Sequence, residues 1–125
     1  MTTNDLEERV RGICMALPEV TERRSHGAPA FFVTKQFAAL MTEGHHDHQF
    51  AHLVCAALPG AQQEHIAMAP DRIFRPPYVG ARGWIGVRLD DTPGFDEIEM
   101  FMEDAYRAVA TARQIALLER GPLSG

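Results

Sequence analysis

Between Val20 and Ala57 the chain contains four short, strand-like runs separated by turn residues, and this pattern restricts the fold more than any other feature of the sequence. The predicted strands are Val20 to Arg24, Ala28 to Val33, Phe37 to Thr42 and Phe50 to Ala57. The connections are short, for example Thr-Lys-Gln after the second run and Glu-Gly-His-His-Asp-His-Gln after the third. Short connections cannot hold a crossover helix, so successive strands should pair as antiparallel hairpins. The pattern therefore predicts a β-meander.

Helical periodicity precedes this meander. Asn4 with Glu7 three residues later resembles a capping box, and the helix should end before Pro18. Apolar residues recur at helical spacing on one face, namely Leu6, Val10, Ile13, Cys14 and Leu17. An N-terminal helix with one buried face is expected.

Two more helices and a late strand are predicted after the meander. A short helix begins after Pro59-Gly60 and ends at Pro70. Residues 84–90 form a strand, and a long helix runs from Phe95 to about Leu118. Its apolar stripe consists of Ile98, Phe101, Met102, Ala105, Val109, Ala112 and Ala116.

The order helix, meander, helix, strand, helix indicates an α+β fold. We expect an antiparallel sheet, made of the meander and the late strand, with the N-terminal, short middle and long C-terminal helices packed mainly on one face. The 125 residues suffice for one self-sufficient core. We predict a single domain over residues 1–119 and a flexible tail over 120–125.

Composition limits the function classes. The net charge of −5 argues against strong non-specific nucleic-acid binding, which depends on neutralising phosphates. No apolar run approaches the length of a membrane span, and the acidic N-terminal segment is unlike a signal peptide. We therefore expect a cytoplasmic protein. Cys14 and Cys55 lack metal or redox spacing and should be buried, reduced thiols.

Residues 72–91 combine arginines with aromatic side chains. In the late strand, side chains alternate between faces, so Ile85, Val87 and Leu89 should enter the core. Trp84 and Arg88 should then point the other way. Aromatic rings beside guanidinium groups suit stacking on a base and gripping phosphate. The candidate nucleic-acid or ligand-binding residues are Arg72, Arg75, Tyr78, Arg82, Trp84 and Arg88.

Some of these candidates, and the histidines of the third connection, have a simpler structural explanation. Trp84 could pack under the Pro76-Pro77 segment or against a helix, with Arg88 paired to an acid. The histidines of the third connection, His45, His46 and His48, offer metal ligands, but a solvated hairpin loop also accounts for them. We therefore assign no metal site there.

Motifs of catalysis and cofactor binding are absent from the sequence. Ser25 and His26 are adjacent on an extended segment, so their side chains should point to opposite faces. The chain contains no nucleophile elbow, zinc-protease motif or phosphate-binding P-loop. We expect a protein that is not an enzyme and requires no cofactor.

Several motifs resemble those of the MmcQ/YjbR family. A Gly-x-Pro-x-Phe hairpin lies at Gly27 to Phe31, followed by Lys-x-Phe-Ala at Lys35 to Ala38. A Gly-Trp-Ile-x-Val-x-Leu-Asp strand covers Gly83 to Asp90, and Glu-Asp-Ala-Tyr-Arg covers Glu103 to Arg107. These motifs occur in the family's order between Leu17 and Ala110.

The resemblance implies an α+β fold of the double-wing type, similar in layout to frataxin-like domains, and a DNA-binding function. It brings no established catalytic residues. Two functions follow as hypotheses. The chain is either a weak binder of DNA or another nucleic acid, or an interaction module for a small anionic or aromatic ligand or a protein. Neither hypothesis involves a membrane, and the oligomeric state is left open.

Overall fold

The computed structural model describes residues 3–25, 27–42, 50–89 and 94–120. The helices and strands of the described chain are α1 (Thr3–Met15), β1 (Thr21–Ser25), β2 (Ala28–Val33), β3 (Lys35–Met41), β4 (His52–Cys55), α2 (Ala61–Met68), β5 (Ile73–Phe74), the 3-10 helix η1 (Val79–Arg82), β6 (Ile85–Arg88), α3 (Phe95–Val109) and α4 (Ala112–Arg120). They follow the predicted order, with three additional elements, β5, η1 and α4.

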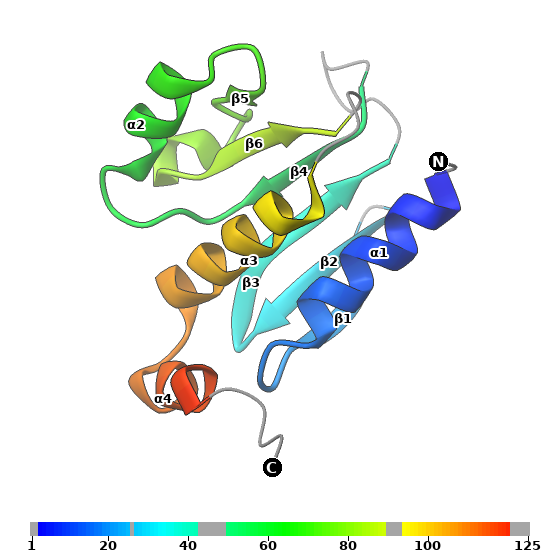
Figure 1. The fold of residues 1–125 in the computed structure, drawn as a ribbon, viewed down its shortest axis with the longest axis vertical. Helices are drawn as coiled ribbons and strands as arrows, with labels where there is room; N and C mark the ends of the chain where they lie inside the picture. The colour runs from blue at the N-terminus through cyan, green and yellow to red at the C-terminus, as the bar shows by residue number, and fades with distance from the viewer. Residues whose placement is uncertain (1–2, 26, 43–49, 90–93, 121–125) are drawn as a thin grey trace.

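The six strands form one antiparallel sheet in the order β1-β2-β3-β4-β6-β5. The predicted meander is confirmed as β1 to β4, and the late strand β6 pairs with β4 (Figure 1). The connection between β2 and β3 is shorter than predicted, because Thr34 alone separates the strands and adopts a positive φ of 71°. The third connection, residues 43–49, lies outside the described residues.

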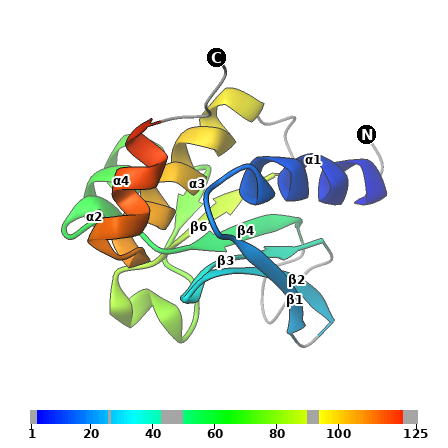
Figure 2. The same cartoon turned by 90° about the horizontal axis from the view of Figure 1, so that it is seen from below.

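The helices α1 and α3 cover one face of the sheet, as predicted (Figure 2). Leu40, Leu53 and Val87 are paired across β3, β4 and β6, and all three are fully buried. They form the centre of a core that includes Val10 of α1 and Ile98 of α3. The fold class is therefore an α+β sheet with helices packed on it.

The C-terminal region contains two helices where the sequence pattern predicts one. Thr111, between α3 and α4, forms a capping box with Gln114. The Gln114 backbone N–H donates to Thr111 Oγ1 at 3.2 Å, and the Thr111 N–H donates to Gln114 Oε1 at 3.0 Å. Ala112 and Ala116, predicted to continue the buried stripe, are exposed. The capping box restarts the helix in a new direction, which turns these alanines to solvent.

Both cysteines are free and buried, as predicted. Burial raises the pKa of the Cys55 thiol to about 12 and raises that of Cys14 still further, because an apolar environment disfavours the thiolate. Neither thiol is therefore poised for nucleophilic chemistry. Within the described residues, no helix is long and apolar enough to cross a membrane.

A candidate nucleic-acid or ligand interface

The segment from Arg75 to Gly83, called the arm below, carries an exposed tyrosine on an unusual turn. Tyr78 has φ 66° and ψ −68°, and the Val79 N–H donates to the Pro77 carbonyl oxygen at 2.7 Å. These values define a γ-turn with positive φ, a rare and strained conformation for a residue with a side chain. Tyr78 is 81% exposed. The turn thus holds this residue at the surface.

A buried glutamine of α2 anchors the base of the arm. Gln62 Nε2 donates to the carbonyl oxygens of Gly80 at 2.9 Å and Trp84 at 2.6 Å. Gly80 lies within η1, and Trp84 lies two residues after its end. Strained backbone persists only where its surroundings over-determine it, and Gln62 provides such a constraint. The arm is therefore held in position before any ligand arrives.

Two of the predicted arginines accompany Tyr78 on the arm. Arg75 and Arg82 are exposed, and neither forms an ion pair within the described part of the chain. The Arg75 side chain lies so close to Gly80 that a Cβ there would come within 2.6 Å of Arg75 Cγ. Guanidinium groups without a carboxylate partner are available to an anion.

Trp84 lies in the core and is only 5% exposed. The alternation of strand faces does not extend to Trp84, because β6 begins only at Ile85. In addition, Gly83, the residue before Trp84, adopts a positive φ of 88°. The guanidinium carbon of Arg82 lies 5.2 Å from the Trp84 ring centre. Trp84 therefore contacts Arg82 from a buried position and does not present an open stacking surface.

Arg72 and Arg88 occupy two other places. Arg72 donates to both carboxylate oxygens of Glu97 in α3, one of them at 3.0 Å, so its charge is already matched. Arg88 is paired opposite His52 in the sheet, and its guanidinium carbon lies 4.0 Å from the Phe50 ring centre. Of the six predicted residues, Arg75, Tyr78 and Arg82 are exposed on the arm, whereas Trp84 is buried.

An aromatic cluster beside Arg88 was not anticipated. The rings of Phe50, His52 and Phe74 pack edge to face, with centroid separations of 5.3 to 5.7 Å. Phe74 lies against Gly86, where any Cβ would collide with its ring. The sequence signal is the alternation in β4, which places His52 and Val54 on one face. Because His52 pairs with Arg88 and Val54 with Gly86, all four residues share that sheet face. This cluster covers the sheet face that the sequence left open at Gly86.

The histidine-rich connection with His45, His46 and His48 lies outside the described residues, as do His26 and Asp90. Within the described residues, no group of three or more histidine, cysteine, aspartate or glutamate side chains is placed to hold a metal ion.

Comparison with known proteins identifies the family. The YjbR family model matches residues 15–108. Among solved structures, the chain is similar to the crystal structure of the Deinococcus radiodurans protein DR2400, described as carrying the domain DUF419, with 21% identity and a TM-score of 0.66. That alignment covers 94% of this chain and 88% of the other, and at this identity it supports the fold alone. No curated protein matches the chain significantly. The chain belongs to the YjbR (MmcQ/YjbR, DUF419) family.

Proposed function

We propose that this domain is a non-catalytic module that binds nucleic acid weakly through the arm. The observation that carries the proposal is Tyr78, an aromatic residue that is 81% exposed on a strained γ-turn. Strained backbone clusters at functional sites because an unconstrained loop would relax. Arg75 and Arg82 accompany the ring and carry no carboxylate partner within the described residues.

The chemistry of the three side chains suits an unpaired nucleotide. The Tyr78 ring stacks on a base, which contributes roughly 1–3 kcal/mol of binding free energy per base. Arg75 and Arg82 bind the flanking phosphates through paired N–H donors. A base within a duplex cannot reach such a ring without being extruded. Single-stranded DNA or RNA is therefore the ligand that the arm should prefer.

Weak affinity follows from the charges. The net charge of −5 repels polyanions at long range, and only two arm guanidinium groups are available to phosphate. For single strands each phosphate contact contributes about −0.7 to the slope of log K against log salt. Two contacts therefore predict a slope of roughly −1.4.

Fluorescence anisotropy with a labelled oligothymidylate tests the proposal. We expect measurable binding at low salt with the slope given above. Tyr78→Gly removes the ring while relieving the strained φ, and it should weaken binding about tenfold. Arg75→Ala combined with Arg82→Ala should remove the salt dependence.

Arg120→Ala is the matched control, because Arg120 is exposed at the end of α4 and belongs to no ion pair among the described residues. It should leave the affinity unchanged. No binding by the parent protein at low salt, or equal losses in the control and the arm variants, would overturn the proposal.

The same arm geometry also suits a small aromatic anion. A nucleoside monophosphate offers one ring for Tyr78 and one phosphate for an arginine. Thermal stabilisation by such a ligand, with little salt dependence and no oligonucleotide binding, would favour this second function. Titrating the parent protein with both ligands distinguishes the two functions, and Tyr78→Gly tests whether the bound ligand uses the arm.

A further inference from the structure

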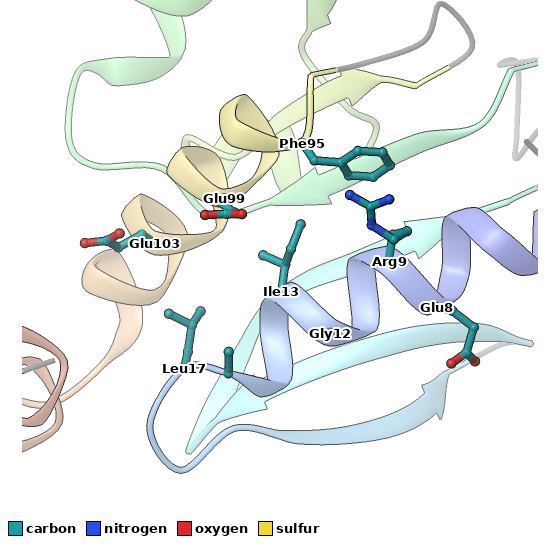
Figure 3. Close-up of a pocket in the computed structure, with 9 residues that line it drawn as sticks. Glu8, Arg9, Gly12, Ile13, Leu17, Phe95, Glu99 and Glu103 are labelled. Atoms are coloured by element: carbon teal, nitrogen blue, oxygen red, sulfur yellow. The ribbon is translucent and has the colours of Figure 1, made fainter. Parts of the chain in front are cut away.

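A pocket of about 430 Å³ lies between α1 and α3, on the helical side of the sheet (Figure 3). Its floor consists of Ile13 from α1, Leu17 from the turn that follows α1, and Phe95 from the start of α3. Carboxylates also line the pocket, namely Glu99 and Glu103 on α3 and Glu8 on α1, whose side chain points away from Phe95 in Figure 3. The pocket combines an apolar floor with an acidic rim, and its size is within the range of small-molecule sites.

The pocket already holds one cation. The guanidinium carbon of Arg9 lies 4.0 Å from the centre of the Phe95 ring, which is a cation–π contact. Within the described residues, Arg9 forms no ion pair with the rim carboxylates. The face of Phe95 therefore attracts a positive charge. Arg9, which occupies that face, does not directly neutralise the rim carboxylates.

The rim carboxylates differ in how far the protein satisfies them. Glu8 accepts a hydrogen bond from Arg11 at 2.5 Å, and Glu103 has a longer contact of 3.4 Å with Arg107. Glu99 forms no ion pair in the described part of the chain. The rim consequently keeps a negative charge at Glu99 that a bound cation would neutralise.

Gly12 lies in the wall of the pocket, and contacts among the described residues do not explain why a glycine stands there. Glycine destabilises a helix interior relative to alanine, and a Cβ at Gly12 would meet nothing within 4 Å. Internal packing therefore does not require a glycine in α1. Because glycine has no side chain, it keeps this side of the pocket open to a ligand.

We propose that this pocket binds an aliphatic amine of the diamine or polyamine class. Its methylene groups contact Ile13, Leu17 and Phe95, and its ammonium groups lie at Glu99 and the neighbouring carboxylates. At 1.5 Å per residue, Phe95 to Glu103 spans about 12 Å along α3, which suits a short linear molecule. A partner helix contacting only this length buries much less than the roughly 800 Å² per side of a stable protein interface.

Isothermal titration calorimetry with spermidine tests the proposal. We expect saturable binding that weakens as salt rises, because the contacts are charged and close to the surface. The neutral analogue 1,8-octanediol, which keeps the apolar chain, should not bind detectably. Magnesium chloride should weaken spermidine binding no more than sodium chloride does at the same ionic strength, because the magnesium ion lacks an apolar body.

Two variants locate the site. Glu99→Gln keeps the shape and removes the charge, and it should weaken spermidine binding about two- to fivefold, as expected for an exposed charge pair. Gly12→Leu fills the pocket with a good helix former and should abolish binding while keeping or raising the melting temperature. Glu64→Gln, an exposed acid on α2, should leave the affinity unchanged.

Equal spermidine affinity in the parent protein, Glu99→Gln and Gly12→Leu would overturn the proposal, since binding would then be non-specific attraction to an acidic protein. The absence of binding by the parent protein would overturn it as well. The pocket shares no residue with the arm, so its test is independent of the oligonucleotide experiment.

Discussion

The Tyr106 hydroxyl donates a hydrogen bond to the Pro18 carbonyl oxygen at 2.9 Å, joining α3 to the segment between α1 and β1 across 88 positions of the chain. The same hydroxyl contacts the Gln114 carbonyl oxygen at 3.3 Å, and the ring packs edge-on against Phe37 of β3. Tyr106 thus joins the segment between α1 and β1 to the sheet and to α4. Its motif, Glu-Asp-Ala-Tyr-Arg, has a structural role in this chain.

Tyr106→Phe should lower the free energy of unfolding by about 1 kcal/mol, the usual contribution of one hydrogen bond, because the ring packing remains. Urea denaturation followed by circular dichroism measures the change. Tyr106→Ala should cost about 3–5 kcal/mol, since it also leaves a large cavity. Equal stabilities of the parent and Tyr106→Phe would show that the hydroxyl does not stabilise the folded state.

Gly86→Ala and Gly12→Ala should change stability in opposite directions. A Cβ at Gly86 collides with the Phe74 ring on the neighbouring strand, so the substitution should destabilise by about 1–3 kcal/mol. A Cβ at Gly12 enters open space in α1, so alanine should stabilise by roughly 0.5–1 kcal/mol. Thermal denaturation of the pair checks both signs. A destabilised Gly12→Ala would contradict the open geometry described for α1.

Gln62→Ala should loosen the arm. The substitution leaves the Gly80 and Trp84 carbonyl oxygens without their buried donor, at a cost of about 1–3 kcal/mol. Hydrogen exchange of the arm amides should accelerate more than that of β3, because the lost contacts are local. Gln63→Ala, the exposed neighbour on α2, is the matched control. Uniform acceleration across the protein would indicate global destabilisation instead.

The Glu19–Arg113 ion pair predicts a pH dependence of stability. Hydrogen bonds from Arg113 at 2.7 and 2.8 Å, with a further one from Gln114, lower the pKa of Glu19 from about 4.5 to about 2. The folded state therefore binds this proton less readily than the unfolded state. The stabilisation is complete above about pH 4.5 and is lost as pH falls toward 2.

Glu19→Gln should accordingly be less stable than the parent protein near pH 6, and the difference should shrink as pH approaches 2. Urea midpoints measured from pH 6 to pH 2 check this. Glu64→Gln, at an exposed position outside the ion pairs of the described residues, should show no such convergence. A difference for Glu19→Gln that stays constant over this range would contradict the linkage.

The sequence pattern predicts one C-terminal helix where the structure has two, α3 and α4. Periodicity is therefore insufficient to locate the break between them. The apolar spacing from Ile98 continues through Ala112 and Ala116, so periodicity alone supports one helix. The Thr-x-x-Gln signal of a capping box is present in the sequence at Thr111. Gln114 adopts the capping geometry while donating to Glu19 and Thr34, two residues far away in the sequence. Such partners are visible only in the folded chain.

The binding surface shows the same division. Arginine and aromatic content singled out residues 72–91, but the density of such residues carries no information on which carboxylate or ring each will meet. The fold pairs Arg72 with Glu97, places Arg88 over Phe50 and buries Trp84. It leaves Arg75, Tyr78 and Arg82 exposed on the arm. The α1–α3 pocket was missed because neither helix forms it alone.

The sequence by itself determined the antiparallel meander, the helix-covered sheet, the core positions of β6 and the family. Those features depend on alternation, periodicity and short connections, which are local properties of the chain. The tertiary structure decided the break after α3, the burial of Trp84 and the pairing of Arg72 with Glu97. Those features depend on contacts between residues up to 95 positions apart, such as Gln114 with Glu19, and no local pattern encodes them.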